Sequence, residues 1–77
     1  MIRIQRELND KLTIVHVGAR TLYFSYETLI AFEKHGELFI SKNIWSNTTG
    51  RHLNWIDDDK EFRMDNDKFM EFARREL

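Results

Sequence analysis

The sequence predicts a small α+β fold: an antiparallel sheet of about five strands, with a short helix and a C-terminal helix packed on one face. Two observations predict it. The first two-thirds of the chain consists of short segments with strand-type patterns, and the last third changes to a helical period. With 77 residues and no glycine-rich or low-complexity linker, the chain is expected to form a single domain over residues 1–77.

Five segments with alternating, β-branched or aromatic residues are predicted to be strands. The connections between them are short, which favours antiparallel neighbours because parallel pairs need crossovers of a dozen or more residues. Turn-forming residues stand at three of the connections: Asn9-Asp10, Gly18 and Lys34-His35-Gly36. The predicted strands span residues 2–6, 12–17, 21–26, 28–33 and 37–41.

The C-terminal segment, residues 66–76, is predicted to be a helix with Asp65 or Asn66 as its N-cap. A helix this short is marginal in water, so it must dock on the sheet. Its apolar residues recur at helical spacing and form one stripe for that docking: Phe69, Met70, Phe72, Ala73 and Leu77.

A second, shorter helix is predicted from about Thr48 to Trp55, because Ser46, Asn47 and Thr48 all offer capping oxygens. Gly50 destabilises this helix by about 1 kcal/mol relative to alanine. Residues 61–64 are predicted to form a short last strand.

The composition disfavours several classes of protein. Lys and Arg number 12 and Asp and Glu number 13, a net charge of −1, which suits neither a strongly basic nucleic-acid binder nor a strongly acidic DNA mimic. Cysteine is absent, so disulfides and thiolate chemistry are excluded. No segment offers the ~20 apolar residues of a membrane span, and no apolar leader segment is visible, so no membrane association is expected.

Metal and catalytic motifs are missing as well. His16, His35 and His52 lack the spacing of metal ligands, and Asp57-Asp58-Asp59 with Glu61 does not match the calcium-loop pattern. Neither a nucleophile elbow nor a phosphate-binding glycine loop occurs in the sequence. We therefore expect no metal, no cofactor and no enzymatic activity.

The segment Trp45–Asn54 is the densest in unusual polar residues and is the candidate recognition surface. Arg51 and His52 lie beyond the helix cap, so capping does not require them, and an Arg there suits an anionic partner. In the alternative interpretation, Arg51 pairs with Asp57 or Asp58 and the segment only anchors its helix.

Aromatic residues extend this candidate surface. Strand alternation places Tyr23 on the face opposite Leu22 and Phe24, where we expect it to be exposed. Exposed Tyr and Trp near Arg are typical of binding hot spots and of base-stacking platforms. The candidate binding residues are therefore Tyr23, Trp45, Arg51, His52 and Asn54; alternatively, at least one Trp packs the short helix onto the sheet.

Two sequence blocks resemble a family of small uncharacterised phage proteins. Residues 23–31 are YFSYETLIA and residues 43–54 are NIWSNTTGRHLN. They match the family's blocks YFSY-x-T-x-(I/V)-A and (N/V)-x-W-S-x-T-T-G-(K/R)-H-L-N, and the likeness covers about residues 21–56. The family has no activity to transfer. The resemblance implies a small accessory protein made inside an infected bacterium.

These observations favour a non-enzymatic protein that binds a host or phage protein in the bacterial host cytoplasm, with a component of an antiviral defence system as one such target. Nucleic-acid binding through Tyr23, Trp45, Arg51 and His52 is the alternative, and an enzyme acting on a small metabolite comes third. A homodimer is also expected, because a short sheet leaves open edges, although Arg3 and Arg6 in the first strand could protect one edge.

Overall fold

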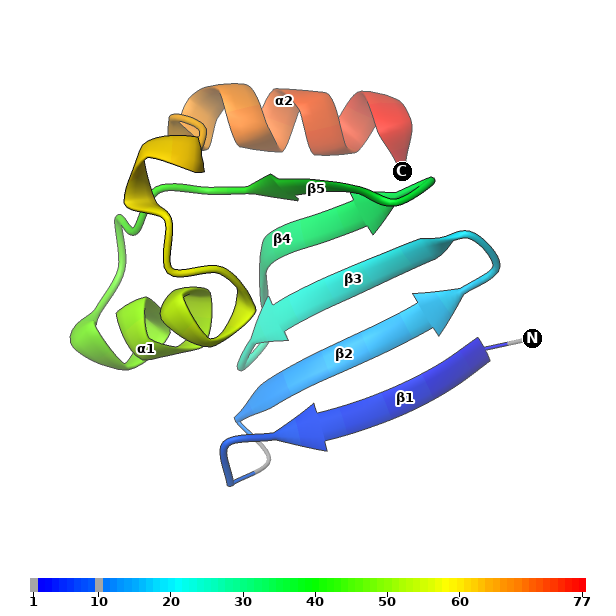
Figure 1. Cartoon of the computed structure of the whole chain (residues 1–77), viewed down its shortest axis with the longest axis horizontal. Coiled ribbons are helices and arrows are strands. Elements are labelled where there is room, and N and C mark those ends of the chain that lie inside the picture. Colours follow the sequence, from blue (N-terminus) through cyan, green and yellow to red (C-terminus); the bar gives the residue numbers. More distant parts are fainter. Residues whose placement is uncertain (1, 10) are drawn as a thin grey trace.

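The computed structural model describes residues 2–9 and 11–77. Its five strands form one antiparallel sheet in the order β1-β2-β3-β4-β5, so every strand pairs with its neighbours in sequence (Figure 1). The predicted α+β class is confirmed. The elements are β1 (Ile2–Glu7), β2 (Leu12–Val17), β3 (Arg20–Ser25), β4 (Thr28–Lys34), β5 (Glu37–Ile40), α1 (Asn47–Ile56), a short 3₁₀ helix (Lys60–Phe62) and α2 (Asn66–Glu76).

The hairpin turns use backbone conformations that strand-to-strand connections favour. His35 and Gly36 both have positive φ, +53° and +79°, and connect Lys34 to its partner Glu37. Two central residues with positive φ are the signature of the type I′ turn, whose twist matches that of the flanking strands. At the β1–β2 turn Asn9 also has a positive φ, as its turn chemistry predicts, whereas Asp10 lies outside the described residues.

Strand β4 contains a β-bulge that explains three consecutive buried residues. Tyr23 pairs with Ala31 and Phe24 with Leu29, which leaves Ile30 without a partner on β3. The extra residue lets Ile30 and Ala31 both join one apolar cluster, while Phe32 joins another. The core therefore has two parts, one on each face of the sheet.

The two helices cover opposite faces of the sheet. Leu53 of α1 belongs to the cluster of Ala31, and Phe69 of α2 belongs to the cluster of Phe32. Successive residues of a strand point to opposite faces, so these clusters lie on opposite sides of β4. The predicted placement of both helices on one face is wrong, because the central strands are apolar on both faces and each face needs a cover.

Helix α2 docks through an aromatic cluster, as its apolar stripe predicts. The ring centroids of Phe32 and Phe69 lie 5.7 Å apart, and those of Phe39 and Phe72 lie 4.6 Å apart. Such separations are typical of favourable aromatic pairs. Phe69 is fully buried, which makes it the anchor of the helix.

The predicted strand over residues 61–64 is wrong. Lys60–Phe62 forms a 3₁₀ turn whose N-cap, Asp59, accepts a hydrogen bond from the backbone N–H of Glu61. Only Met64 joins the sheet, through a single parallel bridge to Ser41. The acidic side chains of this segment favour local turns over a strand ladder. No helix of the described residues is long and apolar enough to cross a membrane.

Candidate functional site

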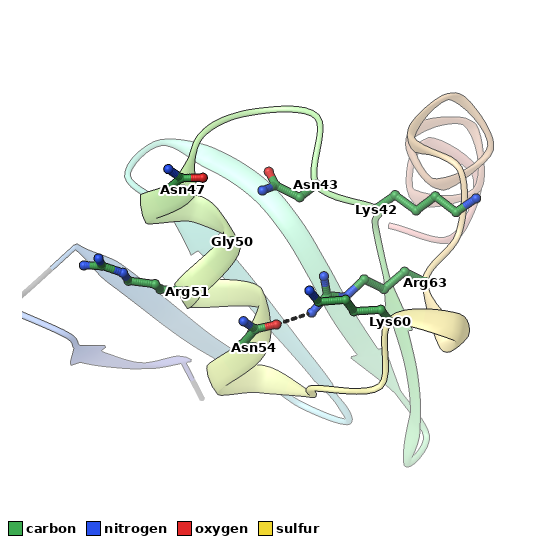
Figure 2. Close-up of a pocket in the computed structure, with 8 residues that line it drawn as sticks. All are labelled: Lys42, Asn43, Asn47, Gly50, Arg51, Asn54, Lys60 and Arg63. Atoms are coloured by element: carbon green, nitrogen blue, oxygen red, sulfur yellow. Dashed lines mark hydrogen bonds between the residues drawn. The ribbon is translucent and has the colours of Figure 1, made fainter.

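A pocket of about 490 Å³ opens beside α1 (Figure 2). Three segments build it: the loop before α1, the exposed face of α1, and the 3₁₀ segment that follows. We call it the basic pocket, because four of the side chains that line it are cationic and none of the described residues in its lining is acidic. Its lining residues are Lys42, Asn43, Asn47, Gly50, Arg51, Asn54, Lys60 and Arg63.

Helix α1 supplies half of this lining because its sequence is amphipathic. Four residues at the spacing i, i+3, i+4 and i+7 share one helix face and line the pocket: Asn47, Gly50, Arg51 and Asn54. On the opposite face, Thr49, His52 and Leu53 are buried against the sheet. Ser46 begins the helix as its N-cap, accepting a hydrogen bond from the backbone N–H of Thr49.

One wall of the pocket leaves little room for a side chain at Gly50. A Cβ added at Gly50 would lie 3.0 Å from Nδ2 of Asn43. That amide is fixed in place, since its Nδ2 donates to the carbonyl of Ser46 and its Oδ1 accepts from the backbone N–H of Trp45, both at 3.0 Å. Gly50 thus allows the loop before α1 to pack tightly against the helix.

Arg63 is the most unusual residue of the pocket. Its side chain is 8 % exposed, and its Nη2 donates to Oδ1 of Asn54 at 2.8 Å and to the backbone carbonyl of Asp57 at 3.2 Å. Its Nε is buried and has no hydrogen-bond partner. No carboxylate of residues 2–9 or 11–77 forms an ion pair with it. A guanidinium charge is therefore buried with neutral acceptors alone.

The four cations of the pocket do not all point inward. Figure 2 shows Lys60 and Arg63 extending from the segment after α1 toward Asn54, whereas Arg51 and Lys42 point away from them at the rim. Lys42 Nζ lies 2.8 Å from Oδ1 of Asp65, and this ion pair holds the pKa of the Asp65 carboxyl below its usual value. Lys60 and Arg63 are therefore the cations that face the interior of the pocket.

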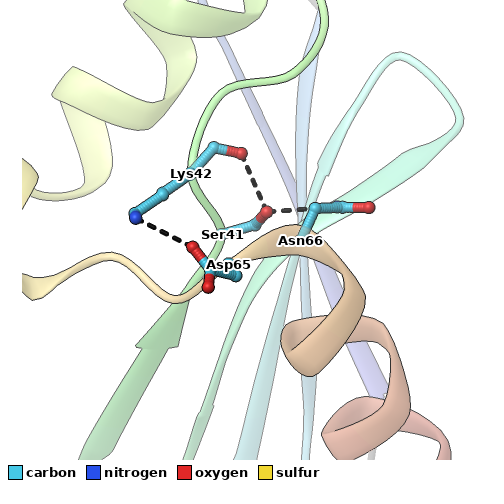
Figure 3. A network of polar contacts seen from close by, with 4 residues as sticks. All are labelled: Ser41, Lys42, Asp65 and Asn66. Atoms are coloured by element: carbon cyan, nitrogen blue, oxygen red, sulfur yellow. Dashed lines mark hydrogen bonds and ion pairs between the residues drawn. The ribbon is translucent and has the colours of Figure 1, made fainter.

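The Lys42–Asp65 ion pair belongs to a network that joins the end of the sheet to the start of α2 (Figure 3). The buried hydroxyl of Ser41 donates to the carbonyl of Lys42 and accepts from Nδ2 of Asn66. Asp65 is the N-cap residue of α2, but its side chain makes no capping hydrogen bond and contacts Lys42 instead. The network fixes α2 relative to the loop that forms the pocket.

His52 lies in the interior, 3 % exposed, so the expectation that it projects toward a partner is wrong. Its Nδ1 is 2.6 Å from Oγ of Ser25, which in turn lies 3.0 Å from Oγ1 of Thr49. Burial lowers the pKa of the imidazole by disfavouring its charged form. Although Ser25 and His52 are within hydrogen-bond reach, Ser25 is only 2 % exposed, so a substrate cannot reach its hydroxyl. The contact ties α1 to the sheet.

Tyr23 and Trp45 are half-buried and pack against the apolar cluster beneath α1. The expected exposure of Tyr23 is wrong, because α1 covers the face of the sheet on which it lies. Burial raises the pKa of the Tyr23 hydroxyl, and the nearby Glu33 carboxylate adds to the effect. The Trp that remains largely exposed is Trp55, at 46 %.

Of the residues predicted to bind a partner, the basic pocket brings together Arg51 and Asn54. Arg51 is exposed and forms no ion pair with the described residues, Asp57 and Asp58 included. The sequence did not predict four other lining residues: Lys42, Asn43, Lys60 and Arg63. The one sequence feature that indicates a basic site is that basic residues flank the short helix on both sides. The acidic run Asp57–Asp59 lies between the helix and the basic residues that follow it, and so obscures this pattern. In the part of the chain that the structure describes, no group of acidic or His side chains could hold a metal ion.

The fold and the pocket together define a small α+β protein whose five-stranded sheet carries a helix on each face and a cationic pocket beside the shorter helix. The chain belongs to a family of unknown function, DUF8033, whose model matches residues 3–72. The matched range spans the residues of both sequence blocks and ends within α2. Membership of an uncharacterised family is confirmed. No curated protein and no solved structure matches the chain.

Proposed function

We propose that the chain is a non-enzymatic binding protein that holds an acidic group of a partner protein in the basic pocket. One observation supports this above the others: Lys60 and Arg63 point into a pocket of about 490 Å³ whose described lining has no carboxylate, on a chain with a net charge of −1. Positive charge gathered locally on a nearly neutral protein favours an anionic partner through complementary potentials.

The biological setting that we propose rests on the resemblance to small phage proteins. The partner is then a host or phage protein in the cytoplasm of an infected bacterium, and a component of an antiviral defence system is one such target. The family match leaves this setting open, because the family is one of unknown function.

Nucleic-acid binding is the second candidate, since phosphates would also satisfy the cations of the pocket. A protein partner is favoured over it, because a stacking platform for bases needs exposed aromatic rings beside the cations that hold the phosphates. Tyr23 and Trp45 are half-buried, and the described lining of the basic pocket contains no aromatic residue.

The proposal is tested by affinity capture from infected-cell lysate in the presence of nuclease. The variant Arg51→Glu/Lys60→Glu reverses two charges at the pocket, and both residues are exposed. The matched control, Lys68→Glu/Arg74→Glu, reverses two exposed charges on α2, on the opposite face of the sheet. We expect the wild type and the control to capture the same bacterial protein, and the pocket variant to lose it.

Two results would contradict the proposal. Equal capture by the pocket variant would place the binding surface elsewhere. Capture that disappears after nuclease treatment would replace the protein partner by nucleic acid. Melting curves of all three proteins are needed first, because the comparison requires that each variant is folded.

A further inference from the structure

We infer that the ligand of the basic pocket is a phosphate monoester, with Arg63 as its buried anchor and Lys60 as the second cation. The inference rests on the proposed function and names the chemical group of the partner that the pocket would hold. It is carried by the burial and hydrogen bonding of Arg63, by the direction of Lys60, and by the composition of the lining.

Arg63 lacks a counterion within the described chain. A guanidinium cannot lose its proton in a protein, so burial must be compensated by partners rather than by neutralisation. The hydrogen-bond acceptors of Arg63 are two neutral oxygens, Oδ1 of Asn54 and the backbone carbonyl of Asp57. Its Nη2 donates both hydrogen bonds. Its buried Nε–H has no acceptor. An anion entering the pocket supplies the missing negative charge.

The number of inward cations selects among anions. A single carboxylate is matched by one Arg in a bidentate pair. A phosphate monoester carries about −1.5 to −2 charges at pH 7 and three strong acceptor oxygens. Lys60 and Arg63 both point toward Asn54 from the same segment, and neither forms an ion pair with the described residues. Two free cations in one pocket match a dianion better than a carboxylate.

The rest of the lining favours recognition of the phosphate group alone. The other lining residues offer amide groups and backbone: Asn43, Asn47, Gly50 and Asn54. The described lining contains no aromatic or large apolar side chain. A nucleobase would find no stacking surface there. A phosphorylated side chain on a protein surface needs none, because the phosphate alone enters the pocket.

The inference is tested by calorimetric titration with three synthetic peptides of one sequence that differ at a single position: phosphoserine, glutamate or serine. We expect the phosphoserine peptide to bind at least tenfold more tightly than the glutamate peptide, and inorganic phosphate to compete with it. Lys60→Gln should weaken phosphoserine binding at least fivefold. Lys68→Gln removes one exposed charge from α2 and should leave the affinity unchanged.

Arg63→Gln tests the anchor directly, but it also removes the bonds to Asn54 and Asp57, so Lys60→Gln keeps the inference testable if that variant fails to fold. Equal affinity for the glutamate and phosphoserine peptides would overturn the phosphate assignment and leave the proposed function standing. Absence of binding to all three peptides would overturn both. Tighter binding of a single-stranded oligothymidine than of the phosphoserine peptide would assign the pocket to the phosphodiester groups of nucleic acid, and would overturn both the monoester and the protein source.

Discussion

At the scale of single residues, Gly50 lies where an added side chain would meet the Asn43 amide. Alanine is a better helix former than glycine by about 0.8–1.0 kcal/mol. At Gly50, however, the added Cβ would meet the Asn43 amide at 3.0 Å, and that amide is held by two hydrogen bonds. Each such bond contributes about 0.5–1.5 kcal/mol. We expect Gly50→Ala to lower the free energy of unfolding, because displacing the amide costs more than the helix gains.

A double-mutant cycle separates the two effects. In an Asn43→Ala background the obstructing amide is gone, and Gly50→Ala should then raise the free energy of unfolding by about 1 kcal/mol. Urea denaturation of the wild type, the two single variants and the double variant measures the coupling. Equal stabilisation by Gly50→Ala in both backgrounds would show that the Asn43 amide yields freely.

The buried imidazole of His52 predicts a specific pH dependence. Its pKa in the folded protein lies below the ordinary value of 6.5, so the unfolded chain binds more protons as the pH falls. Stability is therefore complete above about pH 6.5 and is lost as the pH falls from there toward the lowered pKa of the folded state. We expect the wild-type melting temperature to decrease between pH 7.5 and about pH 5, before the carboxylates titrate.

His52→Asn retains a hydrogen-bonding atom near the position of Nδ1 but does not titrate. It should melt at a lower temperature than the wild type at pH 7.5, and its melting temperature should change less with pH. The matched control is His35→Asn, at the exposed β4–β5 turn, where the positive φ suits Asn. It should keep the wild-type slope. A His52→Asn profile parallel to that of the wild type would exclude His52 as the source.

Only some residues of the basic pocket could be predicted from sequence patterns. Arg51 and Asn54 could be predicted because local helix geometry places them on the exposed face of α1. Lys60 and Arg63 could not, because their approach to that face depends on how the chain turns after the helix. The burial of His52 could not be predicted either, because it depends on a contact with the sheet. Helix periodicity groups it with Leu53, yet its polar ring suggested exposure, and only the position of Ser25 on β3 explains its burial.

At the scale of secondary structure, α2 covers the face of the sheet that carries Phe32. Phe69 is fully buried and contacts Phe32, so Phe69→Ala should cost about 3–5 kcal/mol. A domain of 77 residues has a total stability of about 4–12 kcal/mol. We expect the variant to unfold at much lower urea concentration or to show no cooperative transition.

Phe62→Ala is the matched control for this prediction, because Phe62 is 51 % exposed in the 3₁₀ segment and undergoes the same chemical change. It should change the free energy of unfolding by less than about 1 kcal/mol. Equal effects of the two substitutions would mean that α2 does not dock through Phe69.

Most elements could be predicted because their signals are local. Alternation and turn residues define the strands, and the stripe that contains Phe69 defines α2. Residues 61–64 could not be assigned in this way, because four residues carry too little periodicity and Asp59 competes by capping a turn. The faces of the two helices also lay beyond local patterns. The bulge at Ile30 and the pairing of Tyr23 with Ala31 decide which side chains share a face.

At the scale of the whole molecule, the sheet is covered unevenly. Helix α2 packs on the Phe32 cluster, while the β1 end of the same face carries exposed apolar side chains, with Ile2 at 67 % and Ile4 at 58 %. Strand β1 pairs with β2 alone, so its outer edge presents unpaired backbone groups and contains no proline. A second copy of the chain can cover this edge by antiparallel pairing of β1 with β1 about a two-fold axis.

The charges of β1 predict a register for such a dimer. When the two strands are centred on Gln5, Arg3 of each copy lies opposite Glu7 of the other, so two oppositely charged cross-strand pairs form at once. We expect sedimentation velocity at micromolar concentration to show a species of twice the monomer mass of 9.4 kDa. Arg3→Glu places like charges opposite each other and should shift the protein to the monomer.

The swapped variant Arg3→Glu/Glu7→Arg restores opposite charges in that register and should recover the dimer. Because it carries the same side chains as the wild type in exchanged positions, its recovery would separate register-specific pairing from a general effect of charge on the edge. Arg3 is exposed and Glu7 is half-buried, so melting curves must show that each variant folds. A wild type that sediments only at 9.4 kDa would refute the dimer, and a double variant that stays monomeric would refute the register.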